Sequence, residues 1–242
     1  SRSLATLAAS GHSGSRWRGG TPSVPPIHPA TGFHFESMEE LDGGLGDDRA
    51  GYVYSRNNAP TQEDFESAVA SLEGAQDAVS YSSGMAAVHA ALVCAGARAG
   101  AAVIAAEEMY GATRTLLARM DGVATRYVRI GKVAEVDAAL RETHAAVLAF
   151  EILSNPLVRI ADAPALIELA HRHGAKVVID STFTTPYLLQ PLSLGADFVV
   201  HSVTKYLNGH GDVLAGVVAA SADRCADLRA HRRVYGSNLG PF

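Results

Sequence analysis

The chain has 242 residues, of which 48% are hydrophobic and 19% are charged, and this composition is typical of a folded globular protein rather than a disordered chain. A formal net charge of −5 argues against nucleic acid as a partner, because phosphate binding requires a basic surface, and no apolar run approaches the ~20 residues that a membrane span needs. The two cysteines, Cys94 and Cys225, are too few for a disulfide framework or a cysteine-based zinc site, so we expect a cytoplasmic protein without a bound metal.

Residues 1–60 are predicted to form an extended N-terminal arm, because several prolines fall between residues 22 and 29 and no helical period is visible. A helical pattern begins at about residue 62, and Thr61 precedes it with Asp64 three residues later, a variant of the capping box. We therefore expect a globular domain over residues 61–242, preceded by the arm.

Short strand-like segments alternate with helix-like segments along this domain. Strands are expected at Ala78–Tyr81, Ala101–Ala105, Thr125–Ile130, Ala146–Phe150, Lys176–Ile179, Phe198–Val200 and Leu214–Ala219. Helices are expected at Met85–Ala95, Thr113–Met120, Val133–Glu142, Ala163–His173 and Ala222–Val234. Strands of this length separated by helices favour an α/β fold, with a mainly parallel sheet and helices on both faces.

Polar residues stand at or just after the ends of five of these strands. They lie in the segments Tyr81–Met85, Glu107–Tyr110, Glu151–Asn155, Asp180–Thr182 and His201–Lys205. Because ligands of open α/β sheets bind at the carboxyl ends of the strands, we expect these segments to form a common site.

The first segment contains the turn Ser82-Ser83-Gly84-Met85, which opens a helix. Its backbone N–H groups and the positive end of the helix dipole would favour a phosphate group. The turn matches neither the P-loop nor the dinucleotide-binding glycine pattern, which disfavours ATP and NAD. A plain helix cap has the same composition, so that interpretation stays open.

The last segment contains Lys205, with the hydroxyl residues Ser202 and Thr204 beside it. Partial burial at a strand end would lower the pKa of the Lys205 amine and make it nucleophilic. A lysine that binds pyridoxal phosphate (PLP) covalently has this character. The alternative is a surface lysine that begins a loop.

Three further strand-end residues extend the PLP hypothesis. Asp180 could supply the acid that a PLP site places against the pyridinium nitrogen. Tyr110 could stack on a planar cofactor, and Asn155 could hydrogen-bond the phenolate oxygen of its ring. Asp180 and Asn155 are also common turn residues, which is the alternative interpretation of both.

At these residues the chain resembles the Cys/Met-metabolism PLP enzymes, the family of cystathionine γ-synthase, cystathionine γ-lyase and methionine γ-lyase. The resemblance runs from about Pro25 to the last residue, and the His201–Asp212 sequence HSVTKYLNGHGD is by itself a specific signature. The other matching segments are Tyr52–Arg56, Ser83–Ala87, Tyr110–Thr113, Ser154–Pro156, Asp180–Phe183 and Thr185–Tyr187.

The resemblance implies the large domain of a fold type I PLP-dependent transferase. Lys205 would form a Schiff base with PLP and shuttle protons between substrate carbons, and Tyr110 would stack on the ring and could act in proton transfer. Asp180 would pair with the pyridine nitrogen, and Asn155 would contact the ring oxygen. The other residues expected to hold the cofactor are Ser83, Gly84, Met85, Thr182, Ser202 and Thr204. Tyr54 and Arg56 would complete the phosphate site of a neighbouring subunit in a homo-oligomer, expected to be a dimer of dimers.

The implied activity is γ-elimination or γ-replacement on a sulfur amino acid, as in transsulfuration. O-acylhomoserine sulfhydrylase and methionine γ-lyase are alternatives on the same scaffold, although Ala112 departs from the cysteine that is usual in methionine γ-lyases. A non-catalytic PLP-binding fragment or subunit is the alternative from another class. It arises because the chain stops at Phe242 in a turn-rich stretch, where we expect the family's C-terminal small domain to be missing.

Overall fold

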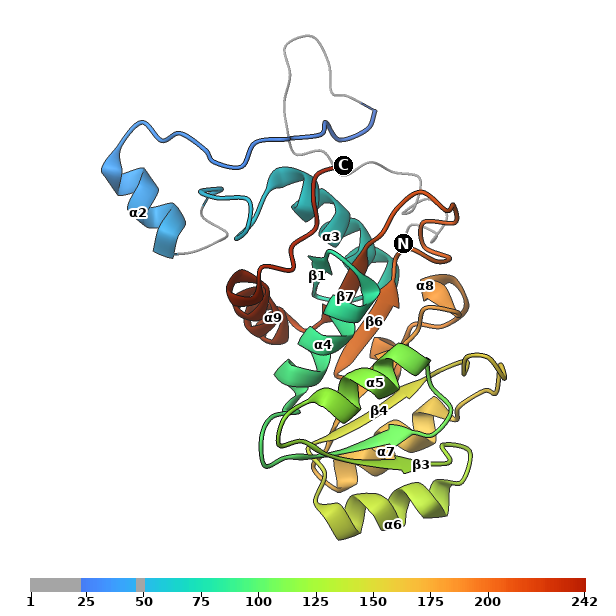
Figure 1. Ribbon diagram of the computed structural model, residues 1–242. Helices are drawn as coiled ribbons and strands as arrows, with labels where there is room; N and C mark the ends of the chain where they lie inside the picture. The colour runs from blue at the N-terminus through green and yellow to red at the C-terminus, as the bar shows by residue number, and fades with distance from the viewer. Residues whose placement is uncertain (1–22, 47–50) are drawn as a thin grey trace.

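Seven short strands form one sheet in the part of the chain that the computed structural model describes, residues 23–46 and 51–242 (Figure 1). Their order across the sheet is β1-β7-β6-β5-β4-β2-β3. The strands are β1 (Asp77–Tyr81), β2 (Ala102–Ala106), β3 (Ala124–Val128), β4 (Val147–Glu151), β5 (Lys176–Asp180), β6 (Phe198–Ser202) and β7 (Gly216–Ala220). Each overlaps a strand expected from the sequence.

The sheet is mainly parallel, as predicted. Strands β3, β2, β4, β5 and β6 pair in parallel, and β7 is antiparallel to both of its neighbours, β6 and β1. The parallel strands therefore end at one edge of the sheet, and polar residues that follow β2, β4, β5 and β6 are brought to that edge.

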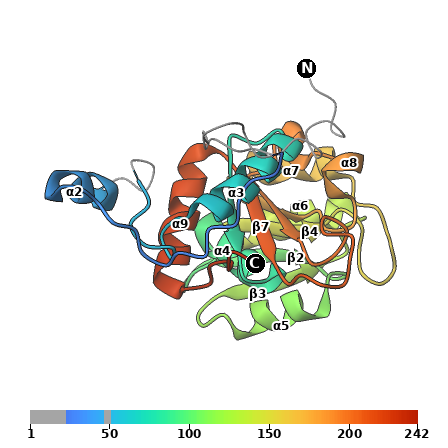
Figure 2. The same ribbon diagram turned by 90° about the horizontal axis from the view of Figure 1, so that it is seen from above.

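Helices cover both faces of the sheet, as predicted. One face carries α4 (Gly84–Ala95), α5 (Gly111–Arg119) and α9 (Ala222–Tyr235). The other carries α3 (Pro60–Glu73), α6 (Val133–Thr143) and α7 (Ala163–Arg172), as the view from above shows (Figure 2). The short helices α8 (Thr185–Leu188) and η1 (Pro191–Leu194) lie in the connection between β5 and β6 and were not predicted.

The core lies on both sides of the sheet and is rich in alanine and valine. Every residue of β4 and β7 is buried, because both strands are central and covered on both faces. Helix α4 packs against the sheet, α5 and α9, and its buried residues include Ala87, Ala90 and Ala91. Small side chains on α4 let its backbone approach the sheet closely.

The arm differs from the prediction in one respect. The described part of the arm contains a helix, α2 (Met38–Gly46), which projects away from the sheet (Figures 1 and 2). Residues 1–22 and 47–50 of the predicted arm lie outside the described residues.

The capping box predicted at Thr61 is wrong. Helix α3 begins one residue earlier with Pro60 at its first position, and Ala59 is its N-cap. Proline is well suited to the first position because its φ angle is already helical and no N–H is needed there. The Thr61 hydroxyl instead accepts the backbone N–H of His28 (2.9 Å) and so joins the arm to the domain.

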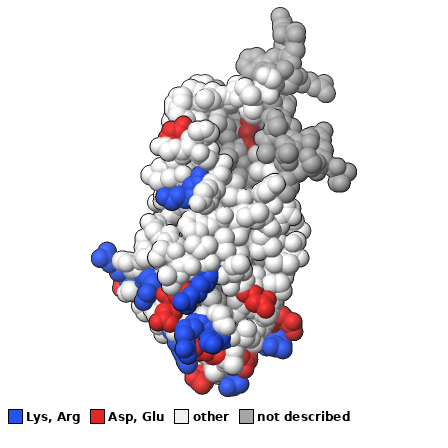
Figure 3. Space-filling view, turned by 90° about the vertical axis from the view of Figure 1, so that its right-hand side faces the viewer, with Lys and Arg blue, Asp and Glu red and all other residues white. Residues whose placement is uncertain are grey.

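Charged side chains of both signs gather at the end of the molecule that carries β3 and α6 (Figure 3). They include the exposed pairs Arg126–Glu142 and Arg129–Glu135, each at 2.7 Å. Exposed pairs of this kind add little stability and keep the surface hydrated. Within residues 23–46 and 51–242, no helix combines the length and the apolar content needed to cross a membrane.

Candidate functional site

A cavity of about 210 Å³ opens at the carboxyl edge of the sheet. Ten of the twelve predicted site residues line it: Ser83, Gly84, Met85, Tyr110, Asn155, Asp180, Thr182, Ser202, Thr204 and Lys205. They come from the segments that follow β1, β2, β4, β5 and β6. Asp180 and Ser202 are themselves the last residues of β5 and β6. The strand ends therefore line a common cavity, and its role as a binding site stays a prediction.

The N-terminus of α4 forms one wall of the cavity. The Ser83 hydroxyl caps α4 by accepting the backbone N–H of Ala86 (3.2 Å), so the plain-cap interpretation describes this side chain. The cap leaves the N–H groups of Gly84 and Met85 outside the hydrogen-bond pattern of the helix, as in the first turn of any α-helix. These groups and the helix dipole make the wall suitable for an anion.

Two glycines allow the α4 turn to approach the sheet. A Cβ atom on Gly84 would lie 2.8 Å from the Cβ of Ser202, and one on Gly216 would lie 2.2 Å from the carbonyl oxygen of Ser83. Both distances are shorter than real Cβ contacts, so a side chain at either position would force the neighbouring atoms to shift. The close approach places Ser83 and Ser202 at the same end of the cavity.

Asp180 ends β5 in the wall of the cavity. Its Oδ1 accepts the backbone N–H of Thr182 (2.9 Å), and the Thr182 hydroxyl in turn accepts the N–H of Ser202 (2.8 Å). Burial raises the pKa of the Asp180 carboxyl, although its hydrogen bonds with Thr182 oppose this effect. A cationic group placed against Asp180 would stabilise its ionised form.

Glu151, the last residue of β4, was missed as a site residue. Its carboxylate lines the cavity and accepts the backbone N–H groups of Tyr110 (2.6 Å) and Asn155 (3.0 Å). Burial, and to a lesser degree the nearby Asp180 carboxyl, raises the pKa of Glu151 to about 7. The strand-end rule had marked the segment Glu151–Asn155, but no motif distinguished Glu151 within it.

Lys205 and Tyr110 both lie at the mouth of the cavity. Lys205 lies in the turn that follows β6, where its backbone N–H donates a hydrogen bond to the carbonyl of Ser202 (3.1 Å). Lys205 is exposed and lines the cavity. The partial burial expected for this lysine is therefore not found, because the turn carries it out of the strand into the opening. Tyr110 immediately precedes α5 and is 47% exposed.

Tyr54 and Arg56 do not line this cavity. Tyr54 is 46% exposed, and the Arg56 guanidinium lies 5.4 Å from the centre of its ring. Arg56 also donates a hydrogen bond to the carbonyl of Arg233 near the end of α9. In this chain the pair is thus placed on the surface, away from the other predicted site residues.

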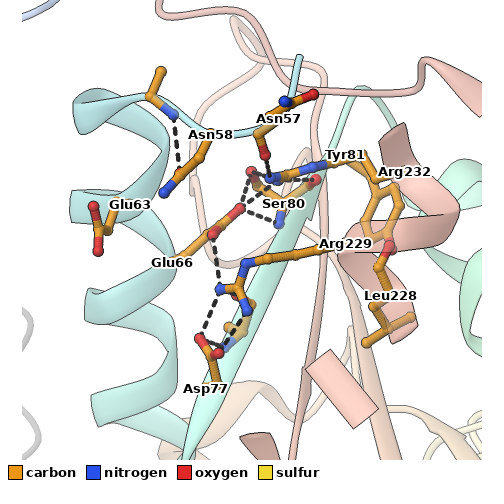
Figure 4. A network of polar contacts seen from close by, with 12 residues as sticks. Asn57, Asn58, Glu63, Glu66, Asp77, Ser80, Tyr81, Leu228, Arg229 and Arg232 are labelled. Carbon is orange, nitrogen blue, oxygen red and sulfur yellow. Dashed lines mark hydrogen bonds and ion pairs between the residues drawn. The ribbon is translucent and has the colours of Figure 1, made fainter. Parts of the chain in front are cut away.

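A buried network of charged residues holds Asn57, the residue after Arg56, to the domain (Figure 4). Arg232 of α9 donates to the Glu66 carboxylate of α3, to the carbonyl and hydroxyl of Ser80 in β1, and to the carbonyl of Asn57 (2.9 Å). Glu66 also accepts the N–H and the hydroxyl of Ser80 (2.8 and 2.7 Å). The network therefore connects two helices, a strand and the segment that leads to the arm.

Comparison with known proteins gives a consistent family. The family described as "Cys/Met metabolism PLP-dependent enzyme" matches residues 6–242. The chain is 37% identical over 224 residues to L-methionine gamma-lyase of Porphyromonas gingivalis, covering 90% of this chain and 55% of that protein. It is 38% identical over 211 residues to cystathionine beta-lyase of Lactococcus lactis, covering 86% of this chain and 54% of that protein.

Solved structures agree with these relatives. The structure of metB from Corynebacterium glutamicum matches with a TM-score of 0.90 and 32% identity, over 100% of this chain and 61% of that one. Cystathionine gamma synthase from Xanthomonas oryzae pv. oryzae, solved in complex with cystathionine, matches with a TM-score of 0.88 and 31% identity over the same shares. The chain thus spans about half the length of the curated relatives and 61% of the length of these solved chains.

Proposed function

The chain belongs to the Cys/Met metabolism PLP-dependent enzymes, and we propose that it catalyses γ-elimination or γ-replacement on a sulfur amino acid, as in transsulfuration. The observation that supports this most strongly is that one cavity is lined by a lysine, an acid, an aromatic ring, an amide and the N-terminus of a helix. Each of these groups is suited to bind one part of PLP.

The walls of the cavity fit the two charged ends of the cofactor. The N-terminus of α4, with Ser83, Ser202 and Thr204 beside it, suits the dianionic phosphate. The Asp180 carboxyl, in the same lining, suits a protonated pyridine nitrogen, which would offset the burial that raises its pKa. Gly84, Met85 and Thr182 complete these walls.

When bound, PLP supplies an electron sink that lowers the cost of removing a proton from substrate carbon. In our proposal Lys205 would hold the cofactor covalently, and its Nζ would carry protons between the α- and β-carbons of the substrate. The support for this role is that Lys205 is exposed and lines the cavity. Tyr110 would stack on the ring and could take part in proton transfer, and Asn155 would contact the ring oxygen.

Absorbance spectroscopy tests the lysine assignment. The purified chain incubated with PLP is expected to become yellow and to retain the cofactor after borohydride reduction, whereas Lys205→Ala is expected to retain none. Lys176→Ala, at the opposite end of β5, is the control and should behave as wild type. Borohydride-stable cofactor in the Lys205→Ala protein would show that another amine binds PLP.

Methionine γ-lyase is the second candidate activity, because several relatives at 37–38% identity carry that name. O-acylhomoserine sulfhydrylase is a third on the same scaffold. Incubation with cystathionine, with methionine, and with an O-acylhomoserine plus sulfide or cysteine distinguishes them by their products. Binding of PLP without turnover of any of these substrates would favour the non-catalytic alternative.

The proposal includes a homo-oligomer, expected to be a dimer of dimers, in which Tyr54 and Arg56 complete the phosphate site of a neighbouring subunit. This part of the proposal is supported by the position of the two residues, which lie on the surface outside the cavity of their own chain although they belong to the family-matching segment Tyr52–Arg56. A guanidinium suits two-point phosphate recognition. Residues 1–60 would then be the intersubunit arm and residues 61–242 the PLP-binding domain. The cytoplasm remains the proposed location, because Cys94 and Cys225 are both free thiols.

A further inference from the structure

Glu151 joins two loops of the cavity through one carboxylate. Its Oε1 accepts the N–H of Tyr110 in the loop after β2, and its Oε2 accepts the N–H of Asn155 in the loop after β4. Glu151 is 7% exposed, so few water molecules compete for these bonds. The two residues held in this way are the ones that the proposed function places on the face and the oxygen of the cofactor ring.

Only an ionised carboxylate can make both bonds well. It presents two acceptor oxygens and no donor, whereas the amide of glutamine presents one acceptor and one NH2 group that would face a backbone N–H. The Tyr110 ring is half exposed, so the orientation of its backbone decides where the ring lies over the cavity. The bond from Glu151 fixes that backbone just before α5 begins.

Asp180 is the other carboxyl at this point of the sheet, and the two have different surroundings. Glu151 and Asp180 are directly opposite each other in the parallel pairing of β4 and β5. The Asp180 Oδ1 is bonded within its own turn, to Thr182, whereas both oxygens of Glu151 hold residues of the loops. One acid can therefore act on the cofactor while the other acts on the residues that contact it.

We propose that Glu151 is a positioning residue, whose carboxylate fixes Tyr110 and Asn155 in the orientation that receives the PLP ring. This inference rests on the proposed function, because it assigns these two residues to the ring. Burial raises the pKa of Glu151 to about 7 and the neighbouring Asp180 carboxyl adds to this, whereas the bonds from Tyr110 and Asn155 favour the ionised form and oppose it. The tests are therefore made above pH 7, where the carboxylate is ionised.

Backbone hydrogen exchange tests the inference before any cofactor is added. In Glu151→Gln without PLP, the amides of Tyr110 and Asn155 are expected to exchange about tenfold faster than in wild type, since at least one bond is lost. Peptides covering residues 107–113 and 152–158 report them in mass spectrometry. The matched control is Glu168→Gln, which removes the same charge from an exposed side chain of α7, outside both peptides.

The second readout is the visible circular dichroism of bound PLP, which depends on how the ring is held. Glu151→Gln is expected to change this signal and to weaken PLP binding about tenfold, a change that corresponds to the loss of one hydrogen bond. Glu168→Gln is expected to change neither. If Glu151→Gln does not fold, Glu151→Asp serves the same purpose. Its shorter side chain keeps the charge but can reach only one loop, so one of the two amides should lose protection.

The possible failures are distinguishable. Wild-type protein that binds no PLP would overturn the proposed function, and with it the role toward the ring. Normal PLP binding, with amide exchange and circular dichroism both unchanged in Glu151→Gln, would overturn this inference alone.

Discussion

The buried pair Glu66–Arg232 allows a sharp test of how α9 is held to the rest of the fold. Both side chains are almost inaccessible, at 2% and 0% exposure. In Arg232→Met the Glu66 carboxylate keeps its bonds from Ser80 and a longer contact with Arg229 (3.4 Å), but it loses the guanidinium that neutralises it most directly. The carbonyls of Ser80 and Asn57 lose a donor at the same time.

Removing one partner of a buried ion pair costs about 3–5 kcal/mol, and we expect Arg232→Met to fall in this range. For a chain of this length that loss lowers Tm by about 6–20 °C. The double variant Glu66→Leu/Arg232→Met removes both charges, so it should be less destabilised than the sum of the single variants by at least about 1 kcal/mol.

Urea unfolding followed by circular dichroism, at one fixed protein concentration, measures the whole cycle. Arg172→Met is the control, because Arg172 pairs with Glu168 at 3.8 Å on an exposed surface and its loss should cost less than about 0.5 kcal/mol. If Arg232→Met costs no more than this control, or if the single costs simply add, the pair does not hold α9 in the way described here.

Three further predictions follow from the site and its surroundings. If Arg56 serves the neighbouring subunit, mixing Arg56→Ala and Lys205→Ala chains should restore about a quarter of the wild-type PLP sites. Half of the randomly formed dimers contain one chain of each kind, and each such dimer has one intact site. No recovery would place Arg56 in its own site. Gly216→Ala should destabilise the fold by about 1–3 kcal/mol and weaken PLP binding, because its new Cβ would lie 2.2 Å from the Ser83 carbonyl oxygen. The control is Gly131→Ala, whose Cβ would have no atom within 4 Å and which should change neither quantity. Thermal melts and PLP titrations measure both variants. Burial lowers the pKa of His231 from 6.5 to about 4, so below pH 6.5 the unfolded chain takes up a proton that the native chain does not, and stability falls as the pH drops toward 4. His231→Phe keeps the ring stacked on Tyr235 (4.2 Å between centroids) and should flatten this decline in urea titrations at pH 4–7; an unchanged slope would exclude His231 as its source.

The sequence predicts the sheet and most of the cavity because both depend on local patterns. Strand-like segments separated by helices specify a parallel sheet, and parallel strands bring Asp180 and Lys205 to one edge without any knowledge of side-chain contacts. Glu151 could not be chosen in this way, since its partners are the backbone N–H groups of two loops whose paths exist only in the folded chain. The exposure of Lys205 was missed for the same reason, because the turn after β6 decides it.

Competition between local signals explains the other differences. Thr61 and Asp64 have the spacing of a cap, but Pro60 already satisfies the first helical position and moves the start of α3 back by one residue. Helix α2 has weak apolar periodicity and contains Gly43 and Gly44, so the sequence offered little reason to expect it.

The alanines of α4 give the hydrophobic core a direct influence on the cavity. Ala87, Ala90 and Ala91 are fully buried along a helix whose first turn forms one wall of the cavity. A larger side chain at any of them would displace α4 from the sheet and move that wall of the cavity away from Ser202. Residues that never contact a ligand therefore set the width of the cavity, and a search for variants with altered cofactor affinity would do well to include them.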